Sequence, residues 1–427
     1  MSRGSNSPNL ICLSLLVAAS HVTYAESAAD TATKLTANPV LQDLADDSWY
    51  VAQDMPSPGA SRSNAAAYSG FAFDSRHGRI VKRGGGHCDY LGTDVQEFDV
   101  LDTLSWSVAV PSVPDTEFLP AAHFDDANFP GAVVVMPDGS APADFAAAVQ
   151  NGMAAPVTRH NTNILTFIES TGEVFLAGKY TYGESGPTLR AVGCSSGTQL
   201  PYSWEPFDAW AYDTSTRRWR YLSRHNVDME WAGCAWVPNG PRVSDTLGAV
   251  FCISEQDRTL HRYDVSADDW NTVGGDVPRT GLGINLTFSR VFRSLYFYRD
   301  QAIFRYDIAA SSWDQVSTAG SVAADNESAT AFDSRNNAIG VWDGDRLYVC
   351  ELSNANSCTW SVASTVNMPN RISRYGVSSN FEYDPVNNVF WAANADSERI
   401  AFGAYRFKGG GGSSPPVPSP PSDLAAN

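Results

Sequence analysis

Residues 80–106 read IVKRGGGHCDYLGTDVQEFDVLDTLSW, and this stretch decides the fold. Apolar and alternating segments lie on either side of three glycines, and a short Leu-Asp-Thr turn precedes Trp106. Such a pattern predicts a strand, a glycine turn, a second strand, a tight turn and a third strand. The stretch also holds the densest group of chemically capable side chains in the chain, which are His87, Cys88, Asp89 and Tyr90.

The Tyr/Phe-Asp pair, polar turn and Trp that end this stretch recur along the chain. The first copy is FDVLDTLSW; the others are YDTSTRRW, YDVSADDW, YDIAASSW and CELSNANSCTW, ending at Trp219, Trp270, Trp313 and Trp360. Successive Trp residues among the last four are 51, 43 and 47 residues apart. Periods of about 40–50 residues with four strands each are typical of propeller blades of the kelch type. We therefore predict an all-β, kelch-type β-propeller.

The last repeat, residues 380–407, has no Trp strand of its own. Residues 47–51, DSWYV, supply the missing pattern near the N-terminus, so we predict that Trp49 pairs with the strand near residues 404–407. This pairing would close the ring and leave no exposed sheet edge. Six Trp-marked blades are visible. A seventh, unmarked blade is possible around residues 132–136, inside the 113-residue interval between Trp106 and Trp219.

The two ends of the chain differ in composition from the repeats. Arg3, an apolar run at residues 10–19 and the small residues of Thr-Tyr-Ala at 23–25 predict a signal peptide over residues 1–25. The propeller domain is expected over residues 26–408. Residues 409–427, which include GGGGSSPPVPSPPS, are expected to be a linker or tail. We therefore expect a secreted protein, extracellular or periplasmic.

The charge balance excludes several classes of partner. Asp and Glu number 47 against 29 Lys and Arg, which gives a net charge of -18. A surface of this sign repels nucleic acid and anionic membranes. No apolar run after the first 25 residues approaches the roughly 20 residues of a membrane span. We expect a monomer without a nucleic-acid or membrane partner, and no cofactor.

Six cysteines remain after the predicted cleavage, and an even number in an oxidising compartment suggests disulfides. Cys350 and Cys358 flank a short turn, and Cys234 and Cys252 lie on successive apolar segments, so both pairs are predicted to be bonded. Elimination then leaves Cys88 with Cys194. The alternative for Cys88 is a structural zinc site that it would share with His87, although no CxxC spacing accompanies it.

Two long intervals interrupt the repeats in the first two blades. Residues 107–158 hold His123 and a helical-looking piece, ADFAAAVQNG, and residues 180–202 hold Tyr182 and Arg190. Insertions of this kind usually project from one face of a propeller and carry its binding surface. A basic cluster, Arg76, His77, Arg79, Lys82 and Arg83, precedes the glycines and predicts a positive patch for an anionic substrate, with a solvated hairpin face as the alternative.

The segment GGGHCDYLGTDVQEFD, followed by APVTRHNTN, resembles secreted bacterial kelch-like propellers that carry a GGGHxDYxGNEVYxFD segment and a later SRHT segment. Their enzymatic relatives are propeller-fold polysaccharide lyases of the ulvan lyase type. The resemblance implies a secreted, seven-bladed protein that cuts uronic-acid polysaccharides with a His, Tyr and Arg set. His87 matches the GGGH histidine and His160 the later one, whereas Tyr182 and Arg190 are candidates without a motif match.

Such a lyase must neutralise the uronate carboxylate, remove the C5 proton and protonate the leaving oxygen. We expect Arg190 or Arg159 to pair with the carboxylate, His87 or His160 to act as base and Tyr182 to act as acid. The set of candidate catalytic residues is His87, His160, Tyr182 and Arg190, and that of substrate-binding residues is Tyr90, Arg159 and His123.

Other functions fit the same fold. A non-catalytic carbohydrate- or protein-binding propeller is the main alternative, because fold alone does not imply chemistry. A copper radical oxidase on a kelch propeller needs two His on late blades, and no His follows His261 in this chain. Glycoside hydrolysis would need an isolated pair of carboxylates, and none stands out.

Overall fold

The computed structural model describes residues 35–56, 69–84, 94–111, 122–125, 129–135, 142–156, 164–178, 208–222, 233–240, 242–254, 258–279, 284–326, 328–369, 380–395 and 400–408. Of residues 84, 122–125, 129–135, 178, 208 and 395 only the backbone is described. Predicted site residues His87, Tyr90, Arg159, His160, Tyr182 and Arg190 lie outside these ranges, as do Cys88 and Cys194.

The protein is a β-propeller with six blades, each built around a four-stranded antiparallel meander. Blade 1 is β2 (Ser69–Asp74), β3 (Arg79–Gly84), β4 (Val95–Asp99) and β5 (Trp106–Val110). Blade 2 is β9 (Thr166–Ile168), β10 (Glu173–Gly178), β11 (Asp208–Asp213) and β12 (Arg218–Tyr221). Blade 3 is β13 (Gly233–Val237), β14 (Ala249–Ile253), β15 (Leu260–Asp264) and β16 (Asp269–Gly274).

The remaining blades follow the same order. Blade 4 is β17 (Thr287–Ser289), β18 (Ser294–Arg299), β19 (Ala302–Asp307) and β20 (Ser312–Gln315). Blade 5 is β22 (Ala329–Asp333), β23 (Ala338–Trp342), β24 (Leu347–Asn354) and β25 (Ser357–Val362), with β21 (Ser317–Ala319) added in parallel at its outer edge. Blade 6 is β26 (Phe381–Asp384), β27 (Val389–Ala395), β28 (Ile400–Arg406) and the N-terminal β1 (Ser48–Val51).

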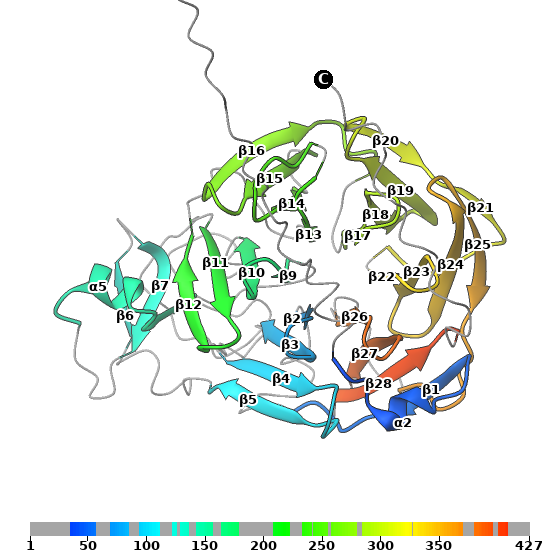
Figure 1. Ribbon diagram of the computed structural model, residues 1–427, viewed down its shortest axis with the longest axis horizontal. Coiled ribbons are helices and arrows are strands. Elements are labelled where there is room, and N and C mark those ends of the chain that lie inside the picture. The colour runs from blue at the N-terminus through cyan, green and yellow to red at the C-terminus, as the bar shows by residue number, and fades with distance from the viewer. Residues whose placement is uncertain are drawn as a thin grey trace, which may run out of the picture.

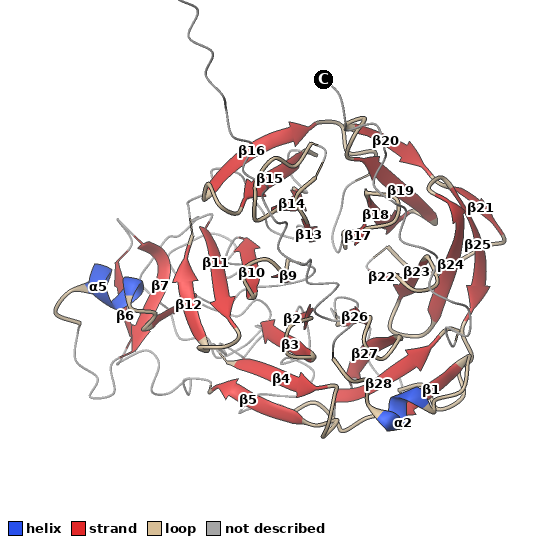
Figure 2. Ribbon diagram, in the orientation of Figure 1, coloured by secondary structure: helices blue, strands red, loops and turns tan. Residues whose placement is uncertain are grey.

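The blades stand around a common centre, with the first strand of each innermost (Figure 1). Strands account for nearly all regular structure, and the two described helices, α2 (Pro39–Gln42) and α5 (Phe145–Gln150), lie outside the ring (Figure 2). Residues 145–150 confirm the helix predicted within ADFAAAVQNG. No described helix has both the length and the apolar character that a membrane span requires.

The predicted closure of the ring is confirmed. Strand β1 pairs antiparallel with β28, and Trp49 is the register partner of Tyr405. The indole N–H of Trp49 donates to the carbonyl of Ser364 at 2.8 Å, which also ties the N-terminal strand to the end of blade 5. The first and last parts of the chain therefore share one blade, as the missing Trp strand predicted.

The possible seventh blade is not part of the ring, which has one blade fewer than the resemblance to ulvan lyases implies. Residues 132–135 belong to β7 (Phe129–Val135), which forms a three-stranded sheet with β6 (Ala122–Asp125) and β8 (Ala154–Pro156). This sheet lies outside blade 2 with α5 beside it (Figure 1). The 113-residue interval thus holds an accessory lobe in place of a blade.

In blades 1, 2 and 4 the repeated Asp before the Trp organises the turn between the third and fourth strands, whereas in blade 3 the N–H groups of Ser266 and Ala267 donate to Asp245. The Asp99 carboxylate accepts hydrogen bonds from the N–H groups of Leu101, Asp102 and Thr103. Asp213 and Asp307 make the equivalent contacts in blades 2 and 4. Short polar turns of this kind need such a local acceptor.

The core lies between the blades, where large side chains of neighbouring sheets interdigitate. At the junction of blades 6 and 1, Phe98 contacts Trp391 and Phe402 with ring centroids 4.9 and 4.8 Å apart. Trp106, the Trp of the first repeat, lies 5.0 Å from Phe402. Each repeat Trp therefore helps to fill an inter-blade layer, which explains why the motif recurs with the blade period.

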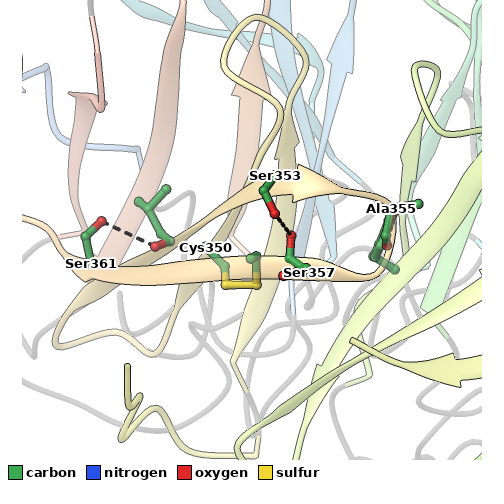
Figure 3. Close-up of a disulfide and its surroundings, with 8 residues drawn as sticks. Cys350, Ser353, Ala355, Ser357 and Ser361 are labelled. Carbon is green, nitrogen blue, oxygen red and sulfur yellow. Dashed lines mark hydrogen bonds between the residues drawn. A yellow bond between two sulfur atoms is a disulfide. The ribbon is translucent and has the colours of Figure 1, made fainter. Parts of the chain in front are cut away.

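Both predicted disulfides are confirmed. Cys234 and Cys252 face each other on β13 and β14, and Cys350 of β24 bonds to Cys358 of β25. Figure 3 shows the second bond beside two hydrogen bonds of the same strand pair, in which Ser353 donates to the carbonyl of Ser357 and Ser361 to that of Val349. Two disulfides are consistent with an extracellular or periplasmic protein.

Candidate functional site

The meander gives the ring two distinct faces. Within a blade, the connections of strands one to two and three to four leave one end of the sheet, here called the hairpin face. The connections of strands two to three, and the links between blades, leave the other end, here called the crossover face. The strand ends that border residues 85–93, 157–163 and 179–207 all belong to the crossover face of blades 1 and 2.

Arg83 is the key described residue on this side of the ring. It precedes the glycines, is 1% exposed, and its Nη2 donates to the carbonyl of Pro156 at 2.5 Å. Its guanidinium carbon also lies 4.8 Å from the ring centroid of Trp219, a position that favours a cation–π interaction. Arg83 borders the segment that holds His87, and Pro156 borders the segment that holds His160. The described ends of the two segments are therefore in direct contact.

A second cation, Lys82, is buried next to Arg83 on the opposite side of β3. Lys82 is fully buried, and the register places it opposite Gln96, whose amide donates to the Asp94 carboxylate at 2.7 Å. Burial lowers the pKa of Lys82 to about 8, although the charge of Asp94 acts in the other direction. Perturbed amines of this kind are more frequent at functional sites than elsewhere.

The basic cluster predicted before the glycines is not one patch. Arg76 donates to three consecutive carbonyls of blade 2, those of Glu169, Ser170 and Thr171. Lys82 and Arg83 are buried near the crossover face, as described above. Because β3 runs from the hairpin face to the crossover face and its side chains alternate between the two sides of the sheet, the five cations do not share one surface. The prediction of a single anion-receiving patch, and the alternative of a solvated face, are both wrong.

Arg79, another member of the basic cluster, pairs with a buried carboxylate on β4. Glu97 is 1% exposed, and its Oε2 accepts from Arg79 at 3.0 Å and from Arg217 of blade 2 at 3.1 Å. The hydroxyl of Tyr212 donates to its Oε1 at 3.4 Å. Burial, followed by the charge of Glu97, raises the pKa of Tyr212 above its usual value. This network fastens blade 1 to blade 2 towards the hairpin face.

Of the predicted site residues, His123 alone falls on a described element. It lies on β6 and pairs with Val134 of β7, which in turn pairs with Ala154 of β8. Two strand spacings, about 10 Å, therefore separate the backbones of His123 and Ala154. The same strand β8 ends at Pro156, the partner of Arg83, so the accessory lobe leads directly to the junction of blades 1 and 2.

The sequence interpretation missed Glu382 on β26, the innermost strand of blade 6. Burial raises the pKa of this carboxyl to about 8, and the N–H of its neighbour Tyr383 donates to it at 3.3 Å. A comparison of the innermost strands would have singled it out, because the equivalent positions in the other blades are Ala or Thr.

Comparison with known proteins assigns no family. No protein-family model matches the chain, and no curated protein matches it. Within the described ranges, no three His, Cys, Asp or Glu side chains are grouped so as to hold a metal ion.

Proposed function

We propose that this six-bladed propeller is a secreted, kelch-like polysaccharide lyase that cleaves a uronic-acid-containing, ulvan-like polymer by β-elimination. The supporting observation is the contact between Arg83 and Pro156, because these residues border the two segments with the histidines of the GGGH and RHN motifs. The site would lie on the crossover face where blades 1 and 2 meet, beside the accessory lobe. The enzyme would act as a monomer on an anionic polymer and without a cofactor.

The proposed chemistry divides three tasks among the motif residues. Arg190 or Arg159 would form a two-pronged pair with the uronate carboxylate and so acidify the C5 proton. His87 or His160 would remove this proton, and Tyr182 would protonate the leaving glycosidic oxygen. Tyr90 and His123 would contact the sugar chain.

The test is product formation from a panel of uronate polysaccharides, followed by absorbance at about 235 nm, where the unsaturated uronate formed by elimination absorbs. We expect His87→Ala and His160→Ala each to lower kcat at least a hundredfold. His77→Ala is the matched control, because this histidine is on the hairpin side of the same blade and bonds to Asp74. Full activity in both His87 and His160 variants would refute the assignment.

The same panel separates the lyase from a carbohydrate-binding propeller. A binding protein would retain a polysaccharide on an affinity gel or in calorimetry without any rise in absorbance. That result with every polymer would replace the lyase by the non-catalytic alternative. An experimental structure with the two imidazoles more than about 15 Å apart would exclude their joint action on one sugar, because each must lie within hydrogen-bond reach of its proton.

A further inference from the structure

Glu382 is an exception within the repeat. Two residues before the end of each innermost strand, the other five blades have Ala72, Thr166, Ala235, Thr287 and Ala331. Blade 6 has Glu382 at this position. Glu382 is also the only Asp, Glu, Lys, Arg or His on the six innermost strands apart from Asp74, Asp333 and Asp384, which end β2, β22 and β26. When one blade carries an unfavourable residue at a position where the other blades carry small ones, that residue often has a special role.

The repeat also shows which way this side chain points. Ala72 packs towards blade 2 and Ala331 towards blade 6, so the position faces the next blade along the chain. By this rule Glu382 faces blade 1, across the junction of blades 6 and 1. Ser69 of blade 1 donates to Asn380 of blade 6 at 2.7 Å, which holds the innermost strands β2 and β26 side by side there.

On its own blade, the Glu382 carboxyl lies beside an aromatic cluster. Its register partner on β27 is Trp391, which packs in one cluster with Phe71, Phe98 and Phe402. The side chain is enclosed by protein yet keeps some accessible surface. A carboxylate in such a place is costly, whereas a neutral carboxyl is tolerated.

Among the described residues, the packing of blade 6 against blade 1 rests on non-covalent contacts. The two described disulfides lie within blades 3 and 5, and neither crosses from blade 6 to blade 1. The junction is held by the inter-blade aromatic cluster and by polar contacts, such as that of the Asn387 side chain with the carbonyl of Val100. A change in charge inside this layer therefore acts directly on the packing of blade 6 against blade 1.

We propose that Glu382 makes the packing of blade 6 against blade 1 dependent on pH, because the packed junction holds its carboxyl beside the aromatic cluster of Trp391 and away from bulk water. Opening of the junction would admit water and release the proton. The device works through the difference between a buried and a hydrated carboxyl, and it is independent of the proposed lyase function.

The charged groups near Glu382 do not change the direction of this effect. Blade 1 contributes Lys82 and Asp94 from the same inter-blade side, and Asp384 follows two residues later on β26. Burial accounts for the raised pKa of Glu382, opposed only by the hydrogen bond from Tyr383. Asp384 has its pKa raised by burial as well, so the experiment must compare chains that both retain it.

The direction of the pH effect follows from the pKa values of Glu382 in the closed and the open state. The closed state holds the proton up to about pH 8, whereas an open, hydrated Glu loses it near its ordinary value of 4.5. Between these limits the open state binds fewer protons, so opening becomes easier as pH rises, by up to tenfold per pH unit. Lys82, whose pKa is also about 8, begins to lose its proton at the upper end of this range, and because burial lowers its pKa in the closed state its effect on opening is opposite to that of Glu382.

Hydrogen exchange of the intact chain at pH 5, 6, 7 and 8, corrected for the intrinsic rates, tests the proposal. We expect the opening constants of peptides from β26 to β28 to rise by about a hundredfold from pH 5 to 8 relative to those from blade 3. Glu382→Gln should abolish this rise and Glu351→Gln, an exposed control on blade 5, should keep it. An equal rise in the Glu382→Gln chain, or a uniform rise in all blades, would overturn the proposal.

A second variant guards against a folding defect of the amide. Glu382→Ala restores the residue that three other blades carry at this position, so the fold itself accepts it. This chain should also show no excess opening of blade 6 at pH 8. If blade 6 of the Ala variant still opens about a hundredfold more at pH 8 than at pH 5, Glu382 is not the group responsible.

Discussion

Trp49 lies opposite Tyr405 in the strand pair that closes the ring, with ring centroids 5.1 Å apart. More than 350 residues separate the two in sequence, so this contact connects the ends of the whole propeller. Trp49 is 3% exposed, and Trp49→Ala should lower the free energy of unfolding by about 3–5 kcal/mol. Urea denaturation followed by circular dichroism measures the change.

Val51, on the same strand, provides the control for this prediction. It is 55% exposed, and Val51→Ala should change the free energy of unfolding by no more than about 0.5 kcal/mol. A loss for Trp49→Ala as small as that for Val51→Ala would indicate that strand β1 contributes through its backbone pairing alone.

The two disulfides should differ in their contribution to stability. The bond between Cys234 and Cys252 closes a loop of 18 residues, and that between Cys350 and Cys358 closes one of 8. Loop-closure entropy predicts about 3 kcal/mol for the first and about 2.5 kcal/mol for the second. Paired Cys→Ser variants, compared by urea denaturation without reductant, give the two values. A larger loss for the shorter loop would contradict the entropic account.

Repeats and closure could be predicted because they depend on local pattern. The Asp–Trp motif has the period of a blade, and a repeat without its Trp strand implies a strand elsewhere, which β1 supplies. The disulfide pairs could be predicted for the same reason, since neighbouring strands of a meander place Cys234 opposite Cys252. Local order of this kind is kept in the fold because five of the six blades are each a continuous stretch of chain.

Contacts between blades were beyond the same reasoning. A run of cations such as Arg76, Arg79 and Arg83 looks like one surface in the sequence, yet Arg76 reaches blade 2, Arg79 pairs with Glu97 of its own blade and Arg83 reaches the lobe. The exception at Glu382 becomes visible only when the innermost strands are aligned by their pairing register. Which side chains meet across an inter-blade layer depends on the rotation between sheets, which a single sequence does not encode in any simple period.

Lys82 should give the protein an unusual alkaline stability profile. Its pKa falls to about 8 through burial, whereas the unfolded chain keeps the ordinary value of 10.5. Between these values the unfolded chain binds more protons, so the free energy of unfolding rises with pH, by about 3 kcal/mol at most. Below pH 8 both states are protonated and Lys82 contributes no slope.

Lys82→Met isolates this contribution, because it keeps a side chain of similar length without the charge. Urea denaturation at pH 7, 8, 9 and 10 should show the rise in the parent chain and no corresponding rise in the variant. At pH 7 the variant should be the more stable of the two. The same slope in both chains would mean that Lys82 keeps its proton throughout the range.

Arg83 allows a direct test of whether the proposed activity depends on a contact of the fold. Arg83→Met would leave the Pro156 carbonyl without its donor and remove the guanidinium from Trp219, so the free energy of unfolding should fall by about 2 kcal/mol. The ends of the segments that carry His87 and His160 would no longer be joined. We therefore expect kcat/KM on the best uronate polymer to fall at least tenfold.

Arg79→Met is the matched control, because Arg79 lies on the same strand β3 but pairs with Glu97 near the other face of the ring. It should destabilise the protein to a similar extent and leave kcat/KM close to that of the parent chain. Arg83→Lys retains the charge but not the planar fork, and it should restore only part of the activity. If the Met variants at positions 79 and 83 lose activity equally, the contact between Arg83 and Pro156 contributes to stability alone, and the proposed site loses its main support.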